Sequence, residues 1–350
     1  RSEHPDDLQA RLADIVQSTG ARAVGVSSGY SSKGPDLGSD YFEPLRMPRV
    51  GLFMGSGIDF TSCGVMWRLL DYEMRLRESL LDITGVQRYD LSAYNVLIIP
   101  SYWGGADALR EQLGQSGLQK LKDWIKAGGT LIAVGDAAYF CADSASGISG
   151  ARDKGSVLEK LADYDTAYVA RRAAFTATVD TAAIWQGKPS EKSGASAKPD
   201  GGGGKPEIDA LRRADEKAQN FGPQGVLVRL NLNPEHWLNF GVANPSADST
   251  RSETVALLYS SHALLAKDPV EVTARIADAG DMRLAGLLWP EARQRWSKTA
   301  FTTRESMGKG QVILFADQPY FRSYFHGTKR LLLNAVLLGP GLGTRQTPPW

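Results

Sequence analysis

The sequence predicts an open α/β sheet that is mostly parallel and doubly wound, and three observations support this fold class. Residues 49–54 form an apolar stretch that indicates a buried strand, and a glycine-containing loop and a helix from about Ser62 follow it. Residues 94–100 and 130–134 are nearly continuous apolar runs, typical of parallel strands that are covered on both faces. Such strands, alternating with helices along the chain, are typical of an open α/β sheet.

Other segments extend this pattern. Val65, Met66, Leu69 and Leu70 share one face of the helix that begins near Ser62, and a further helix ends at Gly128. We expect additional helices over residues 6–19, 118–127, 207–219 and 327–338, and additional strands over residues 226–230, 254–259 and 311–315.

The chain length of 350 residues fits one large domain or two ordinary ones. We expect a connector from an upstream domain over residues 1–48, an α/β domain over 49–340, and a C-terminal tail over 341–350. Residues 187–206 are rich in Lys, Pro, Ser and Gly, which predicts an exposed, flexible insertion within the domain. Because the chain starts at Arg1 without a methionine or an apolar leader, we expect a cut inside a longer precursor.

Composition narrows the function classes. The chain is 42% hydrophobic and 23% charged, with 40 basic and 39 acidic side chains and a net charge of +1. Such a balance provides no long-range field that would attract nucleic acid, so we expect no nucleic-acid partner. Because no apolar run approaches the ~20 residues that span a bilayer, we expect no membrane insertion.

The cysteine content is low, with Cys63 and Cys141 as the two residues of this type. Two thiols without a Cys-x-x-Cys pair suit neither a zinc ribbon nor a dense disulfide framework, and they leave the cellular compartment undecided. In a sheet of order 2-1-3-4, the strand ending at Pro100 separates the two cysteines by more than disulfide reach. We therefore expect free, buried thiols, and a disulfide only if the loops bend together.

Several phrases resemble a known family. They are residues 48–52, 94–102 and 121–132, then 233–237, and finally 308–315 with 319–322 and 326–328. Together they resemble the class I glutamine amidotransferase-like fold, which is flavodoxin-like, and more narrowly the version found at the C-terminus of bacterial zinc carboxypeptidases. This resemblance implies an upstream peptidase domain of the same polypeptide as a partner, and it suggests an exported protein.

An active enzyme of the amidotransferase class requires a cysteine on a sharp strand-to-helix turn, with His and Glu near the C-terminus. Here Gly135 and Asp136 occupy that turn, and Cys141 comes several residues too late. Residues 317–320 stand where the family would show His-Pro-Glu. The sequence therefore predicts that the nucleophile position is degenerate and that the chain has no catalytic residue of this kind.

The zinc site of a carboxypeptidase is also missing. Such a site requires His-x-x-Glu and a distant third ligand, whereas the sequence after His4 has Asp at the glutamate position. The other histidines are His236, His262 and His326. We expect His236 to lie in a turn that places Trp237 on the core, and His326 to be a loop or capping residue. We expect no cofactor or metal in this chain, with zinc only in the upstream peptidase domain.

Polar and aromatic residues follow the predicted strands at the edge where open α/β sheets usually bind ligands. This candidate ligand rim consists of Ser56, Asp59, Ser62, Ser101, Tyr102, Trp103, Asp136, Asp317 and Tyr320. A rim of this kind suits a peptide or a sugar. Aromatic residues also commonly pack over sheet ends for structural reasons, and we favour this structural interpretation.

Two glycine motifs have similar alternatives. Residues 55–57 and the helix after them suit anion binding, but a tight turn is the simpler interpretation because no Lys-Ser pair accompanies them. Residues 25–29 match Gly-x-Ser-x-Gly after a short apolar run that suggests a strand, but the following residues cannot start the helix of a hydrolase turn. We favour an exposed connector there.

We therefore predict a non-catalytic, amidotransferase-like accessory domain of a zinc-carboxypeptidase-family protein. It would position the peptidase domain or bind a peptide or cell-wall ligand at the rim. Two alternatives remain open: a hydrolase with a rebuilt site around Asp136 and Cys141, and a carbohydrate-binding module. The sequence leaves the ligand and the oligomeric state undetermined.

Overall fold

The computed structural model describes residues 7–39, 42, 45–154, 185–186, 222–242, 252–260 and 262–344. The chain divides into two units, Arg1–Pro44 and Leu45–Trp350. The predicted insertion at 187–206, the predicted helix at 207–219, residues 345–350 of the predicted tail, and His4 lie outside the described residues.

The first unit contains the predicted N-terminal helix, α1 (Leu8–Thr19), which ends at Gly20 in the left-handed conformation with φ of 68°. No residue of α1 is buried. The short apolar run at residues 23–26, predicted as a strand, is not one: it has no regular structure, and Val24 and Val26 are exposed. The Gly-x-Ser-x-Gly match that follows therefore lies on an exposed connector, as expected.

The second unit contains one mixed sheet, in the order β10-β6-β9-β11-β12-β4-β3-β1-β2. Its strands are β1 (Val50–Met54), β2 (Glu78–Asp82), β3 (Val96–Ile99), β4 (Thr130–Val134), β5 (Arg152–Asp153), β6 (Val226–Leu232), β7 (Glu253–Leu258), β8 (Leu264–Leu265), β9 (Glu271–Ile276), β10 (Arg283–Ala285), β11 (Ala300–Met307) and β12 (Gly310–Phe315). Its helices are α2 (Phe60–Trp67), η1 (Arg68–Glu73), η2 (Ile83–Gly85), η3 (Leu91–Ala93), α3 (Gly105–Lys126), α4 (Asp136–Ala142), η4 (Trp237–Asn239), α8 (Pro290–Trp296), η5 (Phe321–Ser323) and α9 (Lys329–Leu337).

The parallel core confirms the predicted fold class. Strands β2, β1, β3, β4 and β12 run parallel in that order, which is the flavodoxin-like order. Strands β3 and β4 are buried at every position, as their apolar sequences predict. Because the β1–α2–β2 and β3–α3–β4 connections step in opposite directions along the sheet, right-handed crossovers place α2 and α3 on opposite faces.

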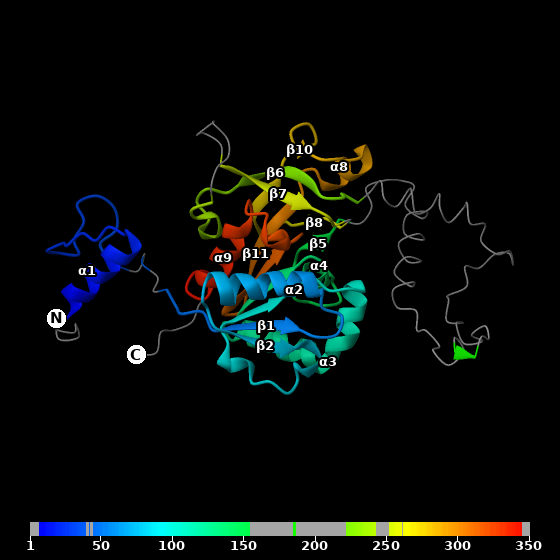
Figure 1. Cartoon of the computed structure of the whole chain (residues 1–350), viewed down its shortest axis with the longest axis horizontal. Coiled ribbons are helices and arrows are strands. Elements are labelled where there is room, and N and C mark those ends of the chain that lie inside the picture. Colours follow the sequence, from blue (N-terminus) through cyan, green and yellow to red (C-terminus); the bar gives the residue numbers. More distant parts are fainter. Residues whose placement is uncertain are drawn as a thin grey trace. The chain divides into compact units, whose positions relative to one another are not determined.

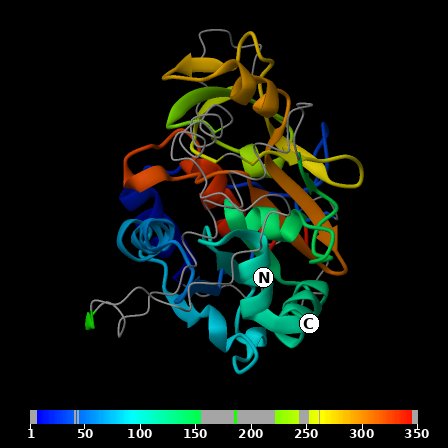
Figure 2. The same ribbon diagram turned by 90° about the vertical axis from the view of Figure 1, so that its right-hand side faces the viewer.

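The remainder of the sheet is antiparallel and extends the core beyond β12. Strands β11, β9, β6 and β7 follow one another in antiparallel pairs. In Figures 1 and 2 the parallel strands form the lower part of this unit, and the antiparallel strands β6, β7 and β10 form the upper part. Because four successive antiparallel pairs separate them, β7 points the same way as β12, and the residues after both strands reach the same edge of the sheet.

One helix is longer than predicted. Helix α3 begins at Gly105, and the predicted segment 118–127 is its second part, which follows an interruption at Gly114 with φ of 63° and ψ of 171°. Glycine is a poor helix former, so Gly104, Gly105 and Gly114 conceal the first part in the sequence. The helix ends at the predicted place, and Gly128 after it has a positive φ of 125°.

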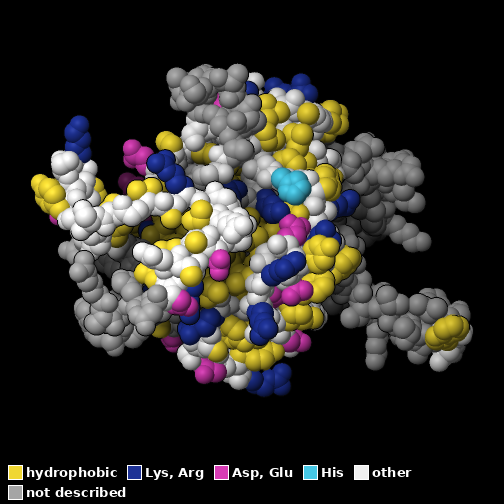
Figure 3. Space-filling view, turned by 60° about the vertical axis from the view of Figure 1, so that its left-hand side comes forward, with side chains coloured by type: hydrophobic (Ala, Val, Ile, Leu, Met, Phe, Trp, Pro, Cys, Tyr) yellow, Lys and Arg dark blue, Asp and Glu magenta, His cyan; other side chains and the backbone are white. Residues whose placement is uncertain are grey.

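The surface of the molecule carries mixed charge. Figure 3 shows acidic side chains among basic and hydrophobic ones on one face. Within the ranges that the structure describes, no helix has the length and apolar character to cross a bilayer.

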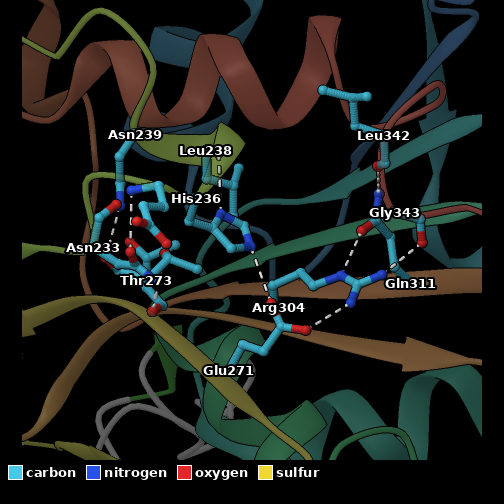
Figure 4. Close-up of polar contacts among 12 residues, drawn as sticks. Asn233, His236, Leu238, Asn239, Glu271, Thr273, Arg304, Gln311, Leu342 and Gly343 are labelled. Atoms are coloured by element: carbon cyan, nitrogen blue, oxygen red, sulfur yellow. Dashed lines mark hydrogen bonds and ion pairs between the residues drawn. The ribbon is translucent and has the colours of Figure 1, made fainter. Parts of the chain in front are cut away.

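A polar network joins β9, β11 and β12 to the chain after α9 (Figure 4). The buried amide of Gln311 donates to the carbonyl oxygens of Gly339 (2.8 Å) and Leu342 (3.0 Å), and its oxygen accepts from Nε of Arg304 (3.0 Å). Arg304 also donates to the Gly343 carbonyl (2.7 Å) and pairs with Glu271 (2.9 Å). This network fixes the C-terminal segment against the start of β12.

We expect Gln311→Leu to lower the free energy of unfolding by about 1–3 kcal/mol, because it removes the amide that the carbonyl oxygens of Gly339 and Leu342 accept from and the acceptor of Nε of Arg304. Urea denaturation followed by circular dichroism measures this change. The matched control is Gln119→Leu on an exposed position of α3, which should stay within about 0.5 kcal/mol of the parent. Equal effects of the two substitutions would contradict the role given to Gln311.

Candidate functional site

The loops that follow β1, β3, β4 and β12 meet at the carboxyl edge of the parallel strands, and they carry the residues of the predicted rim. Ser101 connects three of these loops. Its carbonyl oxygen accepts from the Asp59 amide (2.8 Å), its amide donates to Oγ of Ser62 (3.2 Å), and its hydroxyl donates to Oδ2 of Asp136 (3.1 Å). The sequence prediction therefore brings together residues that are in contact in the folded chain.

Asp59 caps helix α2. Its Oδ1 accepts from the amides of Thr61 (2.8 Å) and Ser62 (3.3 Å), which are the amides that a helix N-terminus would otherwise offer to an anion. Gly57 allows the tight turn before this cap, since a Cβ there would lie 2.2 Å from the ring of Tyr102. The geometry of residues 55–57 therefore favours the tight turn over an anion site.

Asp317 directly follows β12 and is buried. Its Oδ2 accepts from the amides of Tyr259 (2.5 Å) and Ser260 (2.8 Å), and its Oδ1 accepts from the amide of Gln318 (2.7 Å). Burial raises the pKa of Asp317 to about 6, with a contribution from the carboxylate of Asp136, although the three amide bonds act in the opposite direction. Asp317 thus ties the loop after β7 to the loop after β12.

Tyr320 belongs to a second cluster, which involves residues that the sequence did not single out. Its hydroxyl donates to Oε1 of Glu73 (2.7 Å), and Nζ of Lys329 donates to Oε2 of the same carboxylate (2.5 Å). The ammonium of Lys329 lies 4.8 Å from the centre of the Tyr320 ring. Burial and the Glu73 carboxylate raise the pKa of Tyr320 to about 12. The phenol therefore stays protonated and acts as a donor to Glu73.

The remaining rim residues differ in exposure. Tyr102 is buried and donates its hydroxyl to Gln112, whose amide in turn donates to the carbonyl oxygen of Ser56 (3.0 Å). Trp103 is 53% exposed, and its ring lies 5.4 Å from that of Phe60. Most of the rim is thus an internal network, and Trp103 and Ser56 are its exposed members. Ligand binding at the rim stays a prediction.

Gly135 occupies the sharp turn between β4 and α4. Its φ of 57° and ψ of −127° are unfavourable for any residue with a side chain. A Cβ built at this position would lie 2.7 Å from Oγ of Ser101. The chain therefore makes a sharp strand-to-helix turn after β4, and Ser101 occupies the space that a side chain at position 135 would need.

The two cysteines are free, as expected. Cys63 lies in α2 and Cys141 in α4, and β3 lies between β1 and β4 in the sheet. Cys141 is fully buried, and burial strongly raises the pKa of its thiol. Cys63 is only partly buried, which differs from the expectation, and burial together with Asp59 raises its pKa. Burial therefore makes Cys141 inaccessible and unreactive in the folded chain, whereas Cys63 stays partly accessible.

The histidines described by the structure have structural contacts. Nδ1 of His236 accepts from the Leu238 amide (3.1 Å), which leaves its Nε2 to donate to Glu271 (3.1 Å; Figure 4). Trp237 packs against the core, as expected. Nδ1 of His262 lies 2.7 Å from the Asp153 carboxylate. His326 lies in a loop, as expected, and its carbonyl oxygen accepts from the Lys329 amide.

A metal site does not emerge from these residues. Over the described ranges, no group of three or more His, Cys, Asp or Glu side chains is arranged to hold a metal ion.

Sequence reasoning missed Glu73, Lys329, Tyr259 and Ser260 as neighbours of the rim. Glu73 lies at the end of η1, a π-helical turn without a clear sequence signal. Tyr259 and Ser260 reach the rim because β7 is antiparallel to β6. The side-chain Nε2 of Gln318 lies 3.4 Å from Oδ2 of Asp59. Because Gln318 directly follows Asp317, the sequence position alone could have identified it as a rim residue.

Comparisons with known proteins find solved structures with low sequence identity and low TM-scores. No family model matches the chain, and no curated protein sequence matches it. A putative ThuA-like protein from Bacteroides uniformis is 10% identical, with 89% of this chain and 94% of that chain covered and a TM-score of 0.42. A glutamine amidotransferase from Thermotoga maritima is 6% identical, with 77% and 75% covered and a TM-score of 0.41.

A β-galactosidase from Bacillus circulans sp. alkalophilus is 10% identical over 83% of this chain, with a TM-score of 0.42. The present chain spans 30% of the length of that enzyme. The fold class itself follows from the strand order of this sheet, which contains the 2-1-3-4 order that we expect from the sequence.

We expect Gly135→Ala to lower the free energy of unfolding by about 1–3 kcal/mol, because the new Cβ meets Ser101 and the backbone has a positive φ. The matched control is Gly64→Ala in α2, where a Cβ meets no atom within 4 Å and should stabilise the chain by roughly 0.5–1 kcal/mol. Thermal unfolding of both variants decides the point. A neutral Gly135→Ala would show that the turn has room for a side chain.

Asp317 should make stability depend on pH. Its folded pKa of about 6 lies above the unfolded value of about 3.9, so between these values the folded chain binds more protons than the unfolded chain. The stability of the parent relative to Asp317→Asn should therefore fall as the pH rises from about 4 to about 7, by up to about 3 kcal/mol. Urea denaturation at both pH values measures this difference.

The exposed Asp281 provides the control for this titration. If Asp317→Asn and Asp281→Asn give the same pH dependence, the raised pKa of Asp317 is wrong.

Proposed function

We propose that this chain is a non-catalytic accessory domain of a protein that resembles the zinc carboxypeptidases. In this role it positions a peptidase domain or binds a peptide or cell-wall ligand at the carboxyl edge of its parallel strands. The observation that carries the proposal is Gly135, which occupies the nucleophile turn with Ser101 directly against it.

The surrounding residues support a structural role for this edge. The side chains that a catalytic site would need in a reactive state are instead engaged in hydrogen bonds within the chain: Ser101 with Asp136, and Asp317 with three backbone amides. A buried polar network of this kind is rigid when every member is satisfied, and rigidity suits a domain that holds a partner in a fixed position.

The hydrolase alternative would need Cys141 or Asp136 as a reactive group. Full burial of Cys141 keeps its thiol protonated and out of contact with any substrate, which weighs against a cysteine nucleophile. The link to a peptidase domain rests on the sequence phrases at residues 48–52, 94–102 and 121–132.

Enzyme assays test the non-catalytic role. We expect the purified chain to show no glutamine hydrolysis above the rate of a buffer blank, because the turn lacks a nucleophile. We also expect no release of C-terminal amino acids from peptides, with or without added zinc, because the sequence has no His-x-x-Glu pair. Mass spectrometry of the products detects slow turnover.

The controls separate real activity from contamination. A turnover that disappears in Asp136→Asn or Cys141→Ser, while remaining in the exposed variant Asp281→Asn, would contradict the proposal and favour the hydrolase alternative. Activity that is equal in all variants would point to a contaminating enzyme and would leave the expected result, no turnover by the chain, in place.

A further inference from the structure

Strand β2 lies at one edge of the described sheet. Strand β2 is the last strand of the sheet and pairs with β1. In the part of the chain that the structure describes, no strand pairs with its other side. Alternate backbone amides and carbonyls of an edge strand point outward, and they are satisfied by water or by an added strand.

An apolar groove lies beside this edge, between the strand and helix α2. Phe60, Cys63 and Trp67, spaced three and four residues apart on one face of α2, form one wall. Met54 and Leu80 contribute from the sheet, and the cavity volume is about 370 Å³. Phe60 is 72% exposed, Trp67 45% and Leu80 48%. Isolated exposed apolar residues are ordinary, but a contiguous concave group of them indicates a binding surface.

The charges along β2 define what this surface accepts. Side chains alternate between the faces of a strand, so Glu78 and Asp82 lie on the same face as Leu80, the face that α2 covers. Oε2 of Glu78 is buried, and no hydrogen-bond partner for it lies among the described residues. Asp82 is exposed, and its Oδ1 accepts from the amide (2.8 Å) and the hydroxyl (2.7 Å) of Thr84. This face of the strand therefore carries a partly buried carboxylate, an apolar side chain and an exposed carboxylate in alternation.

We infer that the β2 edge binds an extended peptide segment with a basic–apolar–basic alternation. The segment adds a strand to the sheet, its apolar side chain enters the groove against Leu80 and Trp67, and its two cations lie opposite Glu78 and Asp82. This inference goes beyond the proposed accessory role and does not depend on the state of the Gly135 turn.

The same charges argue against a second copy of this chain as the occupant. An antiparallel pair of two β2 strands centred on Leu80 would place Glu78 of one copy opposite Asp82 of the other, so that like charges meet at both ends. The side chains that line the groove are apolar apart from the weakly polar thiol of Cys63, so the groove also offers a sugar few hydrogen bonds. A basic and apolar peptide satisfies both the charges and the groove.

Fluorescence anisotropy with the full 350-residue chain tests this inference. The probe is a labelled, end-blocked peptide of sequence Thr-Lys-Thr-Phe-Thr-Lys-Thr. Two comparison peptides replace both lysines by glutamate or the phenylalanine by serine. We expect each replacement to weaken binding by roughly tenfold or more. Binding of the lysine peptide should also weaken when the salt concentration rises, because the ion pairs lie at the surface.

A matched pair of variants locates the site. Leu80→Glu should weaken binding of the lysine peptide by roughly tenfold, because it places a charge in the apolar groove. Leu284→Glu lies on β10, at the opposite edge of the sheet and with 42% exposure, and it should leave the affinity within about twofold. Circular dichroism establishes that both variants are folded.

Cys63 provides a second readout that needs no variant. Because its thiol lines the groove, the bound peptide should slow its reaction with methyl methanethiosulfonate, whereas the fully buried Cys141 should not react in the folded chain. The inference is overturned if the lysine and glutamate peptides bind equally, or if Leu80→Glu and Leu284→Glu have the same effect. It is also overturned if Leu80→Glu converts a dimer into a monomer and no peptide protects Cys63.

Discussion

The hydrogen bonds of Ser101 hold together the loops that follow β1, β3 and β4. Each of its backbone groups and its hydroxyl has a partner on a different loop residue: Asp59, Ser62 and Asp136. Leaving any of these buried groups unpaired would cost about 1–3 kcal/mol, so the arrangement strongly resists change. Because the Ser101 hydroxyl lies where a side chain at Gly135 would project, the same bonds that stabilise the edge also hold a hydroxyl group in the space next to this turn.

Much of the fold was predictable because the central strands have a strong sequence signal. Strands β3 and β4 are buried on both faces, and their continuous apolar runs are visible without any topology. Strand β2 has the sequence Glu-Ser-Leu-Leu-Asp and β11 carries Thr, Arg and Glu, so neither is apolar enough to be recognised. Their strand conformation depends on pairing with neighbours that are identified only in the folded chain.

The candidate site likewise contains residues that the sequence predicts and residues that only the folded chain reveals. Residues after β1, β3, β4 and β12 were placed together correctly, because parallel strands bring their carboxyl ends to one edge. The contribution of Tyr259 and Ser260 depends on the antiparallel extension, and that of Glu73 depends on a π-helical turn. Asp317 was predicted as a rim residue from the sequence, but its burial and its raised pKa follow from packing in the folded chain.

The position of β12 in the sheet has a consequence for biosynthesis. This strand lies between β4 and β11 and joins the parallel core to the antiparallel extension, yet Gly310–Phe315 follows every other described strand in the sequence. During synthesis the other described strands are therefore made before the two parts of the sheet can be joined. Until then β4 has an unpaired apolar edge, the kind of surface on which chaperones act and from which aggregation starts. The joining of the two parts of the sheet therefore depends on a strand that is synthesised after the others that the structure describes.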